Sequence, residues 1–191
     1  MSTQQFVTLL FLAILTFWAV GAINRLQRLR QTIVDAQPVL AAQLLQRHEW
    51  ARRMASALRT ALPGEADALD RALAAGKQAE AALALVQTKP VAPGPVNSLL
   101  LAENLFDDAV HPLLLRHEAD EAVQGWVQEW LTNQSQLAST RQQFNDAARR
   151  YNEARRQFPT RLVAMLWGFK AAPLLDTPHP RAEPAAGGAP S

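Results

Sequence analysis

The chain has 191 residues, with 19 Lys and Arg against 17 Asp and Glu, and no cysteine. This length fits one domain with appendages, and the lack of cysteine excludes disulfides, thiolate metal sites and a cysteine nucleophile. No stretch alternates apolar and polar residues for long enough to indicate a β-sheet. The composition, rich in Ala, Leu, Arg and Gln, predicts an all-α protein.

The first element is an apolar stretch without charge, FVTLLFLAILTFWAVGAI at residues 6–23. As an α-helix it spans about 27 Å, close to the hydrocarbon thickness of a bilayer. A cleaved signal peptide is the alternative, but such peptides carry positive charge before the apolar stretch, whereas Arg25, Arg28 and Arg30 follow it here. The pattern favours a single-pass anchor over residues 1–23, with its N-terminus outside and the remainder of the chain in the cytoplasm.

A helical pattern then continues to about residue 61. Apolar residues recur there at two heptad positions and form a seam that needs a partner helix: Leu26, Ile33, Leu40, Met54 and Ala61 at one position, and Leu29, Ala36, Trp50 and Ala57 at the other. Arg47 interrupts this seam. Pro38 falls opposite it, on the face that water reaches, where a lost backbone hydrogen bond is tolerated.

Two shorter helices are expected next. An alanine-rich helix fits residues 65–87, and the three prolines within residues 90–95 predict a loop after it. A third helix follows, with Asn97 or Ser98 as its N-terminal cap. Pro112 bends this helix or ends it early.

A fourth helix is expected from near Asp120 to Phe158. Large apolar residues recur in it at strict seven-residue spacing: Val123, Trp130, Leu137, Phe144, Tyr151 and Phe158. The second heptad position is mostly small or uncharged, and every charge lies off both positions. We therefore interpret the rings as helix-packing core rather than as a cofactor site.

Charge and length set the expected arrangement. Residues 24–62 hold 7 basic and 2 acidic residues, residues 63–121 hold 4 and 10, and residues 122–170 hold 7 and 3. Acidic middle helices against basic outer helices favour an antiparallel up-down bundle of about four helices over residues 24–170. Residues 171–191, rich in Pro, Ala and Gly, predict a disordered tail.

The segment RLVAMLWGFK, residues 161–170, is apolar but too short to span a bilayer. In an antiparallel bundle it reaches the point where the first helix leaves the membrane. We therefore expect contact with the membrane interface through Arg25, Arg28, Arg30, Arg161, Trp167, Phe169 and Lys170. The alternative is that the segment packs back onto the base of the first and fourth helices.

Three motifs resemble those of a known family. The stretch STRQQFNDAARRYNEARRQFPTRLVAMLWGF resembles the C-terminal signature of the LemA family of bacterial membrane proteins. NRLQRLRQTIVDA resembles its N-terminal signature, and LAENL at residues 101–105 is a weaker third match. The resemblance implies an N-terminal single-pass anchor in the bacterial plasma (inner) membrane, a long antiparallel helical bundle and no established catalytic activity.

The sequence also departs from that family's pattern. The family's His-acid pair is usually followed by an Ile-Pro-Asn type of stretch, whereas WARRM follows His48 and Glu49 here. Asn133, Gln134 and Ser135 stand where the family has a Thr-Glu-Asn element. A partner that recognises those elements in other members would meet a different surface on this chain.

Motifs for chemistry are incomplete. HEWAR and HEADE each begin with His-Glu but lack the second histidine of a zinc protease. Glu103, Asp107 and His111 share a helical stripe, and Asp108 with His111 has the spacing of half a carboxylate-bridged metal site, but no facing half exists. We expect a solvated face there. The sequence contains no nucleophile elbow, phosphate loop, dinucleotide fingerprint or nucleic-acid module.

These observations predict a non-catalytic, membrane-anchored scaffold or adaptor without cofactor, metal or nucleic acid. Its partners are the lipid bilayer and a protein that the sequence does not identify, and homo-oligomerisation stays open. One rival interpretation is a periplasm-facing coiled-coil subunit of a division or pilus-assembly complex. The other is a hydrolase or metal enzyme that uses His48 or His111.

Overall fold

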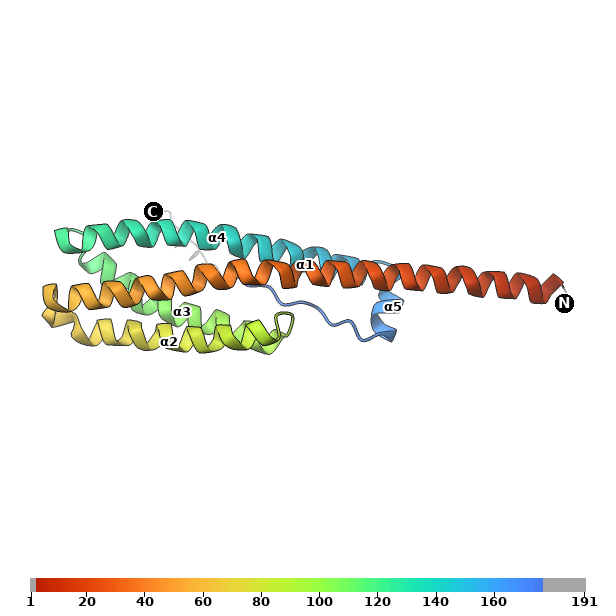
Figure 1. The fold of residues 1–191 in the computed structure, drawn as a ribbon, viewed down its shortest axis with the longest axis horizontal. Helices are drawn as coiled ribbons and strands as arrows, with labels where there is room; N and C mark the ends of the chain where they lie inside the picture. Colours follow the sequence, from red (N-terminus) through yellow and green to blue (C-terminus); the bar gives the residue numbers. More distant parts are fainter. Residues whose placement is uncertain (1–2, 177–191) are drawn as a thin grey trace, which may run out of the picture.

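The computed structural model describes residues 3–176, and all regular secondary structure within them is helical (Figure 1). The elements are α1 (Thr3–Ala61), the short 3-10 turn η1 (Pro63–Glu65), α2 (Ala66–Thr88), α3 (Pro93–Arg116), α4 (Glu121–Arg156) and α5 (Thr160–Leu166). The predicted all-α class is confirmed, with a fifth, short helix that the sequence pattern did not predict as a separate element.

The helix α1 has two different halves on one uninterrupted rod. It contains an 18-residue window long and apolar enough to cross a membrane, near the N-terminus, and the side chains of residues 6–17 are exposed. From Ala22 onward one face is buried, including Leu26, Ile33 and Leu40. The apolar part is consistent with a single membrane anchor, and it continues without a linker into the bundle.

The remaining helices pack against the second half of α1 as an antiparallel bundle. Figure 1 shows α4 running back along α1, while the hairpin of α2 and α3 covers only the part of α1 far from the N-terminus. Near the apolar half, α5 and the extended chain after it take the place of that hairpin. The bundle is therefore four helices thick at its distal end and thinner at its base.

The heptad seams are buried where helices face them. In α4, the side chains of Val123, Trp130, Leu137, Phe144 and Tyr151 are all buried. The prediction for Phe158 is wrong, because its side chain is 82% exposed. The helix α4 ends at Arg156, since a residue before proline disfavours the helical conformation, and the ring leaves the seam. Ala57 and Ala61, at the end of the α1 seam, are also exposed.

Two proline predictions are corrected. The helix α3 begins at Pro93, not after residue 97, and it contains Pro112 and continues to Arg116, so of the two outcomes predicted at Pro112 the early end is wrong. Pro93 and Pro95 lie in its first turn, where backbone N–H groups have no partner within the helix, so proline costs no hydrogen bond there. Pro38 and Pro112 are both exposed inside their helices, as predicted for Pro38.

The chain after α5 is ordered further than predicted. Residues 171–176 are extended along α4, and the side chains of Ala172 and Leu175 are buried. Asn152 donates to the Ala172 carbonyl at 2.8 Å and accepts from its N–H at 2.9 Å, while Asn145 accepts from the Leu175 N–H at 2.7 Å. Disorder from residue 171 is therefore wrong for these six residues; the rest of the predicted tail, residues 177–191, lies outside the described residues.

Candidate functional site

The helix α5 lies against α1 where the apolar stretch ends (Figure 1). One side of α5 packs on the bundle, since Val163 and Ala164 are buried. The other side is apolar yet exposed, with Met165 at 72% and Leu166 at 75% exposure. Phe158, Leu162 and Trp167 are exposed beside them. The segment thus packs back on the bundle with one face and presents a second apolar face outward.

A glycine ends α5 and turns the chain. Gly168 has φ +69°, a left-handed conformation that side chains with a Cβ rarely adopt. The Phe169 N–H donates to the Ala164 carbonyl at 2.9 Å, which is the hydrogen bond that closes a helix ending in a left-handed residue. This turn directs Phe169 and Lys170 toward α4, where the Tyr151 hydroxyl donates to the Lys170 carbonyl at 2.9 Å.

A groove of about 670 Å³ lies between this turn, the α2–α3 loop and the bases of α1 and α4. Its cationic lining residues are Arg30, Lys89 and Lys170, and no acidic residue lines it. Burial raises the pKa of the Tyr151 phenol on its wall, and the charges of Arg155 and Arg30 offset part of that rise. The groove therefore presents positive charge and a neutral phenol.

The sequence-predicted interface residues divide into two groups. Four of them line the groove together: Arg30, Trp167, Phe169 and Lys170. The other three, Arg25, Arg28 and Arg161, are exposed at the base outside its lining. Arg25 donates to the Gln157 Oε1 at 3.5 Å. Sequence reasoning missed Lys89, because only the length of α2 and its packing on α1 bring that loop to the base.

A second polar site lies in the distal half of the bundle. Arg47 on α1 donates through Nη1 to the Glu103 Oε2 at 2.7 Å and through Nη2 to the Asp107 carboxylate. The His48 Nε2 lies 2.9 Å from the Glu103 Oε1. The predicted solvated face is wrong for Glu103, which is 2% exposed, because the compensating charge is on α1 and cannot be seen from spacing within α3. His111 is exposed.

Aromatic rings surround the Arg47 guanidinium. Its Cζ lies 4.8 Å from the Phe106 ring centroid and 4.5 Å from that of Trp130, distances at which a cation is attracted to a ring face. Burial lowers the pKa of Arg47 to about 10, and Glu103 offsets part of the change. Burial likewise lowers the pKa of Arg141 on α4, again offset by Glu103. Arg47 stays charged at neutral pH, and the cluster holds α1, α3 and α4 together.

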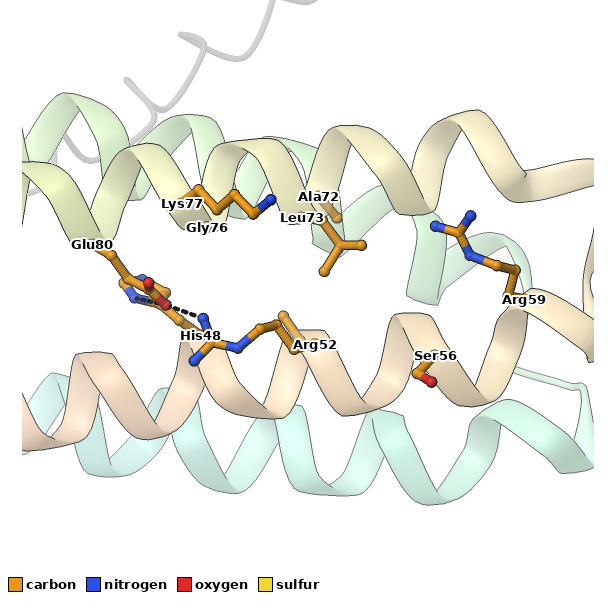
Figure 2. A pocket seen from close by; sticks show the side chains of 10 residues that line it. His48, Arg52, Ser56, Arg59, Ala72, Leu73, Gly76, Lys77 and Glu80 are labelled. Carbon is orange, nitrogen blue, oxygen red and sulfur yellow. Dashed lines mark hydrogen bonds and ion pairs between the residues drawn. The ribbon is translucent and has the colours of Figure 1, made fainter.

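A cleft of about 390 Å³ runs beside this cluster between α1 and α2 (Figure 2). His48 and Glu80 lie together near one end, with Arg52 close to Glu80, and Ser56 and Arg59 lie further along α1. The His48 Nδ1 has no hydrogen-bond partner and is 4.0 Å from the Glu80 Oε1. Within residues 3–176, no three His, Asp or Glu side chains come together in a group that could hold a metal ion.

Comparison with known proteins places these features in a family. The family model described as LemA family matches residues 39–186, which is more than half of the chain. The match contains the LAENL stretch and the C-terminal motif and begins after NRLQRLRQTIVDA. No curated protein and no solved structure was found to match the chain. On the strength of the family match, the chain belongs to the LemA family.

Proposed function

We propose that the protein is a non-catalytic scaffold of the bacterial plasma membrane, anchored by the N-terminal part of α1 and holding its bundle in the cytoplasm. The observation that carries this proposal is the continuity of α1. One helix of 59 residues is exposed and apolar first and then buried along one face of the bundle. Arg25, Arg28 and Arg30 follow the apolar part directly, which favours the cytoplasmic side.

The exposed face of α5 supports a second contact with the same membrane. Exposed apolar residues beside an anchor are stabilised when they enter the headgroup and acyl boundary, and Trp favours that depth. Met165, Leu166 and Trp167 are exposed, and α5 lies against α1 where the apolar stretch ends (Figure 1). In this proposal, α5 lies in the interface and fixes how the bundle stands on the bilayer.

The scaffold role is supported by how the polar residues are used. His48, one of the two histidines on which the enzyme interpretation rests, is buried and lies 2.9 Å from Glu103, a contact that joins α1 to α3. The long outer faces of the helices remain available to a protein partner.

The orientation is tested by fusing reporters after Ser191. A fluorescent protein there should fold and fluoresce in cells, while alkaline phosphatase there should be inactive, because that enzyme needs the periplasm. Phosphatase activity without fluorescence would contradict the cytoplasmic orientation and support the periplasm-facing coiled-coil subunit instead.

The contact through α5 is tested with a chain that begins at Asn24 and therefore lacks the anchor. This chain should float with anionic vesicles, and the double substitution Met165→Ser with Leu166→Ser should abolish flotation. Leu101→Ser with Leu131→Ser is the matched control, since both residues are exposed leucines away from the base. Equal flotation of the two double variants, with unchanged helicity, would contradict the contact.

A further inference from the structure

The groove beside α5 carries positive charge that no carboxylate in its lining neutralises. Arg30, Lys89 and Lys170 line it, no acidic residue does, and none of the three forms an ion pair within residues 3–176. Several other arginines of the bundle, such as Arg52 and Arg59, have a carboxylate partner. Three cations around about 670 Å³ repel one another, and an anion inside the groove would relieve that repulsion.

The position of the groove along α1 narrows the choice of anion. Its lining residues on α1, Gln27 and Arg30, come four and seven residues after Ile23, which is about 6 to 10 Å along a helix. The polar layer of a bilayer occupies on the order of 5 to 8 Å outside the hydrocarbon. If the apolar stretch fills the hydrocarbon, Gln27 stands at the depth of the lipid headgroups and Arg30 stands at their outer edge, within reach of a headgroup phosphate.

The neighbouring side chains fit the rest of a lipid molecule. Trp167 lines the groove and is exposed, and tryptophan rings favour the boundary between headgroup and acyl chains. Met165 and Leu166, on the exposed face of α5, would lie beside the acyl chains. An arginine guanidinium and two lysine ammonium groups are the donors that proteins use for phosphate.

We infer that the groove binds the phosphate headgroup of one anionic phospholipid from the bilayer that α1 enters. This inference rests on the proposed membrane anchoring and adds a specific lipid class to it. The bound headgroup bridges Lys89 of the α2–α3 loop and Lys170 after α5. An anionic lipid thereby ties the distal hairpin to the base of the bundle.

The test uses the full chain in nanodiscs, with native mass spectrometry to count the lipids that stay bound after release. With mixed phosphatidylglycerol and phosphatidylcholine, the chain should retain one phosphatidylglycerol in preference to phosphatidylcholine. Lys89→Gln with Lys170→Gln should lower this retention at least about tenfold, because each cation near an anionic surface contributes about 1 kcal/mol. The control, Arg71→Gln with Lys77→Gln, removes the same charge from exposed positions on α2 outside the groove and should retain the lipid.

Three results would overturn the inference: equal retention of the two lipids, equal loss in the two double variants, or displacement of the lipid by inorganic phosphate at low concentration. The last result would show that the groove prefers a soluble anion. These outcomes are separate from failure of the anchoring proposal. A chain that is extracted from membranes by alkaline carbonate has no anchor, whereas a chain that resists extraction but shows no lipid preference contradicts the groove alone.

Discussion

The distal and basal halves of the bundle are closed in different ways. In the distal half, four helices surround Trp50, Phe106 and Trp130, with Arg47 and Glu103 buried among the rings. Toward the base, the core around Phe144 and Tyr151 combines apolar side chains from all four long helices with Ala164 of α5 and with Ala172 and Leu175 of the extended residues 171–176.

The comparison shows which interactions hold each covering segment, the helical hairpin or the extended chain, on the bundle. A helix brings its own backbone hydrogen bonds, so the distal hairpin needs only side-chain contacts. An extended segment brings none, so the base depends on Asn145 and Asn152 to pair its backbone. The distal half is therefore sensitive to charge, and the base is sensitive to hydrogen bonding and chain direction.

The largest expected effect comes from breaking the distal charge cluster. Glu103→Ala leaves the buried Arg47 with only the partly exposed Asp107 carboxylate as a partner and should lower the free energy of unfolding by about 3 to 5 kcal/mol. Asp108→Ala, an exposed neighbour on the same helix, should change it by less than about 0.5 kcal/mol. Denaturant titration of the detergent-solubilised chain measures both.

Replacing both charged residues sharpens this result. Arg47→Met with Glu103→Leu should recover most of the stability lost in Glu103→Ala, because apolar groups of similar volume can substitute for a buried ion pair. If the double variant is as unstable as the single one, the pair does more than balance charge.

At the base, Asn152→Ala should free the extended segment. The change removes both side-chain hydrogen bonds to Ala172 and should cost about 1 to 3 kcal/mol. Protease cleavage within residues 171–176 should rise while the distal half stays protected. Gln143→Ala, an exposed amide on the same helix, is the control, and equal cleavage in both variants would show that the asparagine does not hold the segment.

A smaller effect is expected from the turn after α5. Gly168→Ala places a Cβ on a residue with φ +69°, and the left-handed conformation costs about 1 to 2 kcal/mol for residues other than glycine. No neighbouring atom lies within 4 Å of that Cβ, so strain and not collision is being measured. Unchanged thermal stability of the purified chain would mean that the turn relaxes at no cost.

The smallest effect is a pH dependence at the far end of the distal half. His117 lies 3.1 Å from the Glu65 Oε1 and 2.9 Å from the Asp120 Oδ2, and these hydrogen bonds raise the His117 pKa above its ordinary 6.5. A raised pKa means that this contribution to stability is complete below 6.5 and is lost as the pH rises through the folded-state value.

At acid pH, protonation of the Glu65 carboxylate weakens its hydrogen bond with His117. The His117 hydrogen bond lowers the pKa of Glu65 below its ordinary 4.5, so its contribution is present above 4.5 and is lost as the pH falls through the lowered value. In the His117→Gln variant, the free energy of unfolding should decline less steeply above pH 6.5. Denaturation midpoints that fall equally with pH in both proteins would remove His117 as the cause.

The seams were predictable because they depend on spacing within one helix. Leu26, Ile33 and Phe144 are buried as the heptads predict, and the antiparallel order follows from short connections. The buried state of Glu103 was not predictable in this way, because its partners Arg47 and His48 come from another helix more than fifty residues away.

The groove at the base could be predicted only in part, because its lining residues also come from different helices. Arg30 and Lys170 were predicted near the membrane from their distance to the apolar stretch, but Lys89 reaches them only through the packing of α2 on α1. The extended residues 171–176 look disordered by composition. Their order depends on asparagines that lie one helix earlier and show no special pattern in the sequence.

If the N-terminal part of α1 is anchored in a membrane as proposed, the unbroken helix α1 acts as a lever. The part of α1 from Asn24 to Ala61 is about 57 Å long. Gly21 lies just before this part and the exposed Pro38 lies within it, and the helix continues through both. Transmembrane helices tilt by about 20° on average, and a tilt change of that size would move the distal end sideways by about 20 Å. Under the proposed anchoring, a change in bilayer thickness that alters the tilt of α1 would displace the far end of the bundle.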